Sequence, residues 1–226
     1  MTERGMIFNG EMVRALLDDR KTQTRRPVRF PVLDKNLGCE LAGNELAGEL
    51  SAGNYLNSAF GKPGDRIWVR EAYRFPASLD DVSPTGVGEM AVATGYRKPW
   101  APTFYEFTGT FSDGWTGFET PPKVSGAGKL RPSIHMPRWA SRITLEITDV
   151  RVERLNSIHD VDAMREGIQN LTTCSHADFG IPGVVNAQHP VRAFQLLWES
   201  IYGADNWKAN PWVWVIEFKR VEGGAA

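Results

Sequence analysis

The most regular hydrophobic pattern in the chain lies in the stretch RITLEITDVRV. Ile143, Leu145 and Ile147 share one face of a predicted β-strand, because side chains alternate between the two faces. The apolar set then resumes at Val150 and Val152, one residue out of phase. A slip of one residue within a strand is typical of a β-bulge or a sharp bend, such as the corner of a barrel. The pattern therefore predicts a strand that bends near its middle.

The C-terminal part of the chain predicts a longer helix and a second strand. The helix begins at Pro190 and ends at Gly203, and its buried stripe consists of Val191, Phe194, Leu197, Trp198 and Ile201. The strand covers residues 212–219 and has apolar residues on both faces at its start. That distribution is typical of a strand with a neighbour on each side.

Capping signals mark the bounds of two shorter helices. In one, Ser157 begins a capping box and the helix ends at Glu166, because the next residue is glycine. In the other, Asn9 is the N-cap and the helix ends near Asp19, a residue type that tolerates the left-handed C-cap conformation. One face of this N-terminal helix is apolar, formed by Met12, Ala15 and Leu16.

The remaining segments are less periodic. A short strand at 6–8 precedes the first helix, and another follows the turn at 63–65. Residues 30–62 indicate a long connection with a helical turn or two, and residues 74–131 an insertion of loops and short hairpins. Strands and short helices in this order do not make regular βαβ units. We expect one α+β domain over residues 1–226, built around a small mixed sheet or barrel with flanking short helices.

Composition narrows the classes of function. Hydrophobic residues make up 42% of the 226 residues, enough for a packed core. The net charge of -1 argues against a protein that coats nucleic acid without specificity, since such binding needs a broad excess of Lys and Arg. Two cysteines cannot form a disulfide framework, and the sequence shows no signal peptide or membrane-spanning run. We therefore expect a cytoplasmic location, without membrane association.

One segment departs from this near-neutral balance. Residues 14–29 hold six bases and two acids, a local excess of four positive charges. The segment is either a solvated loop or an anion-binding site, because guanidinium groups pair well with phosphate. If it is extended, Lys21, Gln23 and Arg25 face one way, and Thr22, Thr24 and Arg26 face the other. A turn at Lys21 would instead let Lys21 and Thr24 converge.

Other polar residues offer weaker signals. His135, Arg138 and Trp139 precede the bent strand and can stack on a base or pair with phosphate, although Trp139 can equally anchor the loop in the core. Arg70 or Glu71 can line a pocket, or form a surface ion pair. Cys174, His176 and His189 match metal spacing poorly and lack a clear fourth ligand, so we expect no metal.

Three stretches, RKTQTRR, GDRIWV and WVIEF, together resemble the ASCH family, a branch of the PUA-like barrels. The hallmark of that family is a G-x-K-x-x-T-x-R segment after the first helix. Lys21, Thr24 and Arg26 fill its K, T and R places, with Arg25 as an alternative to Arg26, and Asp19 stands where the family has glycine. The resemblance covers roughly residues 5–29, 61–72 and 141–221. The phrases RPSIHMPRWASRITLE and NPWVWVIEF are similar to those of phage- and prophage-encoded proteins.

The resemblance implies a function, because small bacterial ASCH proteins include an N4-acetylcytidine amidohydrolase that uses a Lys, a Thr and a Glu. Those roles map to Lys21, Thr24 and Glu166: the amine takes the threonine proton, the hydroxyl attacks the amide, and the carboxylic acid protonates the leaving amine. No metal or cofactor is implied. The ligand-binding residues expected around this centre are Arg20, Arg25, Arg26, Arg70, His135, Arg138 and Trp139.

Three functions remain open from the sequence. The protein is an amidohydrolase acting on an acylated cytidine, a non-catalytic module that binds RNA or a nucleotide in a basic cleft, or a phage accessory protein that contacts nucleic acid or a host protein. The Lys, Thr and Glu together favour the enzyme over plain binding. The arginines favour a ligand that carries phosphate, since a lone nucleoside offers them nothing to pair with.

Overall fold

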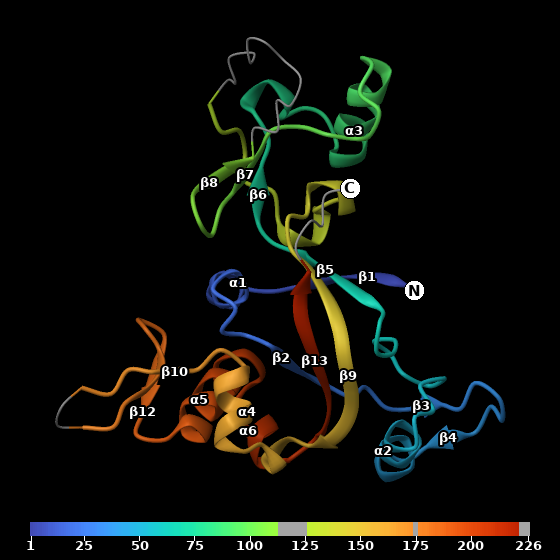
Figure 1. Ribbon diagram of the computed structural model, residues 1–226, viewed down its shortest axis with the longest axis vertical. Helices are drawn as coiled ribbons and strands as arrows, with labels where there is room; N and C mark the ends of the chain where they lie inside the picture. The colour runs from blue at the N-terminus through green and yellow to red at the C-terminus, as the bar shows by residue number, and fades with distance from the viewer. Residues whose placement is uncertain (113–125, 174–175, 222–226) are drawn as a thin grey trace. The chain divides into compact units, whose positions relative to one another are not determined.

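The computed structural model describes residues 1–112, 126–173 and 176–221, which form a mixed α+β structure (Figure 1). The described helices are α1 (Gly10–Leu17), α2 (Gly43–Ser51), α3 (Pro84–Ala93), α4 (Asp160–Arg165), α5 (Pro190–Tyr202) and α6 (Ala204–Lys208). The strands are β1 (Glu3–Ile7), β2 (Gln23–Pro27), β3 (Val32–Leu33), β4 (Glu40–Leu41), β5 (Arg66–Arg70), β6 (Tyr73–Arg74), β7 (Thr103–Tyr105), β8 (Thr110–Ser112), β9 (Thr144–Arg154), β10 (Gln169–Asn170), β11 (Phe179–Ile181), β12 (Val185–Ala187) and β13 (Trp212–Val221). The predicted α+β class is confirmed.

The chain divides into two compact units. Unit 1 comprises Met1–Glu3, Ala15–Arg66 and Leu145–Arg220, and unit 2 comprises Arg4–Arg14, Ile67–Thr144 and Val221–Ala226. The predicted connection 30–62 belongs to unit 1, where it contains α2 and the β3–β4 hairpin. The predicted insertion 74–131 belongs to unit 2.

Unit 1 is organised around β13, which lies between β9 and β2 (Figure 1). Val213, Trp214, Val215 and Ile216 are all buried, as expected for a strand covered on both faces. The prediction of a central strand is therefore confirmed. β2 runs antiparallel to β13, and α4, α5 and α6 pack against one another beside the small sheet β10–β11–β12.

The phase slip predicted in the long strand is present in β9. Leu145 and Ile147 are buried, Thr148 is exposed, and burial resumes at Val150 and Val152. β9 nevertheless stays one continuous strand. Because of the slip, odd-numbered residues (Leu145, Ile147) are buried in the first half of β9, and even-numbered residues (Val150, Val152) are buried in the second half.

The sheets that the described residues form do not close into a barrel. Closure requires hydrogen bonds between the outermost strands. In the described part of the chain, β2 has β13 as its only strand neighbour. The predicted α+β class is therefore confirmed, whereas the described residues form no closed barrel.

Helix boundaries agree with the capping signals at two of three sites. The N–H of Met12 donates to Asn9 Oδ1 at 2.9 Å, so Asn9 caps α1, and α5 spans Pro190–Tyr202 before Gly203 as predicted. The predicted start at Ser157 is wrong. Residues Leu155–Ser157 form a 3-10 turn, and α4 begins after His159. Leu155, the first residue of this turn, and Ile158, which follows it, are both buried. Their side chains therefore pack into the core before α4 begins.

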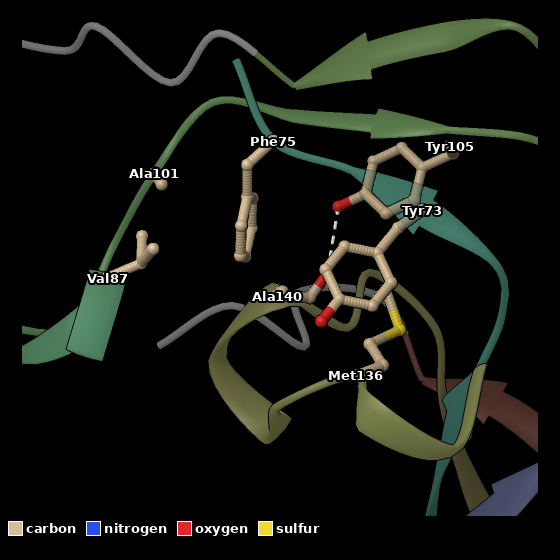
Figure 2. Close-up of a cluster of buried hydrophobic side chains, with 7 residues drawn as sticks. All are labelled: Tyr73, Phe75, Val87, Ala101, Tyr105, Met136 and Ala140. Atoms are coloured by element: carbon tan, nitrogen blue, oxygen red, sulfur yellow. Dashed lines mark hydrogen bonds between the residues drawn. The ribbon is translucent and has the colours of Figure 1, made fainter. Parts of the chain in front are cut away.

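Unit 2 has a hydrophobic cluster made from four separate segments (Figure 2). Its buried residues are Tyr73, Phe75, Val87, Ala101, Tyr105, Met136 and Ala140. β6, β7 and β8 form an antiparallel sheet, so the predicted short hairpins are present here. The helix α3 was not predicted: Ser83 Oγ accepts the N–H of Gly86 at its start, and Pro84 is its first residue.

Of the helices in the described ranges, none combines the length and the apolar character needed to cross a membrane.

Candidate functional site

The turn between α1 and β2 sets the position of Lys21. Asp19 has a φ of 54°, in the left-handed region, and the N–H groups of Arg20 and Lys21 both donate to the carbonyl of Ala15, at 2.9 and 3.1 Å. These bonds end the helix. The prediction that Asp19 adopts the left-handed C-cap is confirmed. Arg220 pairs with the Asp19 carboxylate at 2.8 Å on the surface.

Lys21 donates all the hydrogen bonds that an ammonium group can make. Its Nζ lies 2.7 Å from the carbonyl oxygen of Gln23, 2.8 Å from the carbonyl oxygen of Glu166 and 2.8 Å from Glu166 Oε2. Both side chains are buried, with 1% and 4% of their surface exposed. The structure therefore brings together two of the three predicted catalytic residues, although 145 positions separate them.

The free edge of β2 explains one of these bonds. The N–H of Phe218 donates to the carbonyl of Thr22, so Thr22 and alternate carbonyls after it face β13. The Gln23 carbonyl points away from that ladder. Lys21 supplies the hydrogen bond that a further strand would otherwise provide.

The end of α4 sets the position of Glu166. Glu166 is the C-cap of the helix, and Gly167, at a φ of 109°, turns the chain in a conformation that favours glycine. The N–H of Thr22 donates to the carbonyl of Arg165 at 2.9 Å. This bond ties the start of β2 to the end of α4 and holds Glu166 against Lys21.

Arg25 is the second cation that binds Glu166. Its guanidinium donates to Glu166 Oε1 at 3.2 Å, to Gln23 Oε1 at 2.8 Å and to Glu153 Oε1 at 2.7 Å, and it lies 3.6 Å from Asp162 Oδ2. Its side chain is fully buried. Arg25, expected at a phosphate-binding surface, is instead surrounded by the protein's own carboxylates.

Burial has the largest effect on the pKa of Lys21. Removal from water lowers the pKa of its ammonium below the ordinary value, because the charged form loses its hydration. Glu166 opposes this shift through its charge and its hydrogen bond, and Arg26 and Arg25 add to it by repulsion. The Lys21 pKa remains lowered, as expected for an amine that serves as a base.

Thr24 lies in β2 opposite Ile216 of β13 and is 4% exposed. Strand alternation puts it on the other face of β2 from Gln23 and Arg25. Within the described residues, its hydroxyl makes no hydrogen bond to Lys21 or Glu166. A common cavity for all three groups remains a prediction.

The other expected ligand-binding residues of unit 1 are Arg20 and Arg26. Arg20 pairs with Asp18 at 2.8 Å, near the surface. Arg26 is half-buried and close enough to Lys21 to lower its pKa.

In unit 2, the expected residues have separate surroundings. The guanidinium of Arg70 lies over the ring of Trp68, and His135 is exposed. Arg138 is half-buried and donates to Thr144 Oγ1 at 3.3 Å. Trp139 stacks on Phe75 with ring centroids 5.4 Å apart, which is the core-anchoring role foreseen as its alternative.

Sequence reasoning missed the network of polar side chains around Gln23 and Arg25. Asp162 and Glu217 bind Gln23 Nε2, at 3.4 and 3.1 Å, and Arg151 binds Glu217. A signal was present, because polar residues alternate along β9 after the phase slip, at Asp149, Arg151 and Glu153. The pattern showed a polar face but gave no indication of which residues it would contact.

In the described residues, neither a cluster of potential metal ligands nor a cavity indicates a second functional site in unit 1. Cys174 lies outside the described residues, and the described ones contain no group of three His, Cys, Asp or Glu able to hold a metal. Two hollows, of about 380 and 520 Å³, are lined by residues within 171–186 and 30–45. Neither includes Lys21, Thr24 or Glu166.

Comparison with known proteins shows no match to a family model, a curated protein or a solved structure.

Proposed function

We propose that unit 1 carries an ASCH-type amidohydrolase centre that deacylates an N4-acylated cytidine, with Lys21, Thr24 and Glu166 as catalytic residues. The observation that supports this proposal is the buried contact of 2.8 Å between Lys21 Nζ and Glu166 Oε2. Two groups of opposite charge, both shielded from water and one with a lowered pKa, are typical of catalytic acid–base pairs.

The pair can generate both protonation states that the reaction needs. Transfer of one proton from Lys21 to Glu166 along their hydrogen bond leaves a neutral amine and a carboxylic acid. The amine then accepts the proton of the Thr24 hydroxyl as its oxygen attacks the amide carbonyl carbon, a step that requires Thr24, on the other face of β2 from Gln23 and Arg25, to come within reach of Lys21. The carboxylic acid protonates N4 of cytosine as the C–N bond breaks. Water then hydrolyses the acyl-threonine, releasing the acid and restoring the hydroxyl.

The charges around the pair favour a substrate without phosphate at this position. Arg25 is engaged by Glu166, Glu153 and Asp162, and Arg20 pairs with Asp18. Glu217 adds a further carboxylate beside Gln23. A nucleoside therefore suits the centre better than RNA, whose phosphates would meet these carboxylates.

The test is deacylation of N4-acetylcytidine, followed by chromatography of the cytidine formed. We expect Lys21→Ala, Thr24→Ala and Glu166→Gln each to lower kcat/KM by about 1,000-fold. Lys208→Ala, which removes an exposed lysine, is the matched control and should keep full turnover.

Full turnover by Lys21→Ala or Glu166→Gln would reject the mechanism. Binding of the nucleoside by wild-type protein without turnover would favour the non-catalytic alternatives. A large preference for N4-acetylcytidine 5′-monophosphate over the nucleoside would contradict the argument from charge and return Arg26 to the role of phosphate ligand.

A further inference from the structure

Arg25 is a buried cation whose two terminal nitrogens have hydrogen-bond partners in the described part of the chain, whereas its Nε has none there. A guanidinium remains charged in proteins, and burying it without partners would cost several kcal/mol, so carboxylates must surround it. Glu153, Asp162 and Glu166 fill that role, and the ring of Phe194 lies 5.9 Å away. One of these three carboxylates is the group expected to act as the catalytic acid.

The two oxygens of Glu166 have different partners. Oε2 accepts from Lys21 at 2.8 Å, and Oε1 accepts from Arg25 at 3.2 Å. With Oε1 held, the carboxyl group cannot rotate freely about its last bond. Oε2 is thereby kept in line with the ammonium from which the proposed proton transfer takes place.

Arg25 is itself held from two sides. Gln23 Oε1 accepts from the same terminal nitrogen that binds Glu166, at 2.8 Å, while Glu153 accepts from the other, at 2.7 Å. Gln23 and Arg25 share one face of β2, as strand alternation requires, and Lys21, just before the strand, binds the same glutamate. The arginine is placed by its strand and its partners, independently of any ligand.

We propose that Arg25 is a positioning residue, which orients the Glu166 carboxyl for proton exchange with Lys21, and that it is not a ligand of the substrate. This inference rests on the proposed function. It assigns Arg25 a role that differs from phosphate binding, and it predicts a kinetic signature that neither a substrate ligand nor a purely structural residue would produce.

The first experiment compares Arg25→Lys and Arg25→Gln with wild type on N4-acetylcytidine. Arg25→Lys keeps the charge but cannot bridge Glu166 and Glu153 with two nitrogens, so kcat should fall about 100-fold while KM stays within about twofold. In Arg25→Gln, kcat should fall by at least the same factor. Arg192→Gln, an exposed change on α5, is the matched control and should leave both constants unchanged.

The pH profile adds a readout that a structural role would not affect. The charged groups that act on the Lys21 amine are Glu166, Arg26 and Arg25, and Arg25 lowers its pKa by repulsion. The active pair shares one proton, so activity is lost at high pH as Lys21 deprotonates. Arg25→Gln should move this alkaline limb to higher pH, whereas Arg25→Lys should leave it in place.

A second experiment does not depend on turnover. In protein labelled with 15N-lysine, the Nζ signal of Lys21, assigned by its loss in Lys21→Arg, is followed through a pH titration by NMR. Its midpoint should lie below the ordinary lysine value of about 10.4 in wild type and should rise in Arg25→Gln. It should rise much less in Arg25→Lys.

Several results would overturn the inference. A raised KM with unchanged kcat would make Arg25 a substrate ligand, and lower thermal stability with unchanged kinetics would make it structural. If the titration midpoint of Lys21 is the same in Arg25→Gln as in wild type, Arg25 does not act on the Lys21 amine. If wild type shows no turnover, the proposed function fails, and the NMR titration alone decides whether Arg25 controls the pair. If Arg25→Gln does not fold, Arg25→Lys and Gln23→Leu, which frees Arg25 on one side, carry the test.

Discussion

Each of the two units buries a glutamate against an arginine, but the two arrangements differ. In unit 2, both oxygens of Glu71 accept from the single guanidinium of Arg142, each at 2.9 Å. Arg142 also binds the hydroxyls of Thr108 and Thr110 and lies over the ring of Tyr105. In unit 1, the oxygens of Glu166 are divided between Arg25 and Lys21.

The two ion pairs differ in whether their cation can lose a proton. An arginine does not give up its proton in proteins, so the cation of the Glu71–Arg142 pair keeps its charge, and the pair links the residue after β5 to the segment before β9. Lys21 can give up its proton, and burial lowers the pKa at which it does so. Buried glutamates of similar exposure can therefore have different roles, according to whether their cation is able to titrate.

The largest contrast between the units is expected in alkali. Burial raises the pKa of Tyr73 and of Tyr105 in unit 2 to about 12, while an unfolded tyrosine titrates near 10. The Tyr73 hydroxyl donates to the carbonyl of His135. The Tyr105 hydroxyl donates to the carbonyl of Ala140 (Figure 2). Stability from these groups is complete below pH 10 and is lost as pH rises toward 12, by about 3 kcal/mol for each tyrosine.

Lys21 should contribute with the opposite sign. Because its folded pKa is lowered, its charged form opposes folding below that pKa, and this cost disappears as pH rises toward about 10.4. Urea unfolding from pH 8 to 12 measures both effects. Tyr73→Phe and Tyr105→Phe should each remove about half of the loss above pH 10, and the same fall in both variants as in wild type would refute the assignment.

The next largest effect concerns Glu71. Changing Glu71→Gln removes one partner of a buried pair, so the free energy of unfolding should fall by about 3 kcal/mol. Turnover per folded molecule should be unchanged, in contrast to Glu166→Gln. Urea unfolding and activity, both measured at low temperature where the variant is folded, separate the two quantities. A loss of kcat in fully folded Glu71→Gln would erase the distinction between the two glutamates.

The smallest effect is expected at the turn before Lys21. Asp19→Gly should raise the free energy of unfolding by about 0.5 kcal/mol, since glycine adopts the left-handed conformation without strain. The exposed pair with Arg220 offsets only part of this gain. Thermal unfolding and turnover are the measurements. Destabilisation by more than about 1 kcal/mol would show that the carboxylate, and not the backbone, holds the turn.

Much of the fold followed from local patterns. Apolar residues on both faces predicted β13 as a central strand, alternation predicted the phase slip in β9, and capping residues predicted the bounds of α1 and α5. The start of α4 and the open sheet were not predicted, because they depend on packing around Leu155 and on which strands pair. Such choices are made between segments far apart in sequence.

For the candidate site, sequence alone determined the left-handed turn at Asp19 and, for an extended segment, the common face of Gln23 and Arg25. Both follow from local backbone geometry. Only the tertiary structure decided that Arg25 is enclosed by carboxylates 128 and 141 residues away, and that Glu166 is shared between two cations. A charge can be buried only where partners compensate for its lost hydration. Here those partners come from β9, which β13 separates from β2 in the sheet, and from α4, which packs against β2.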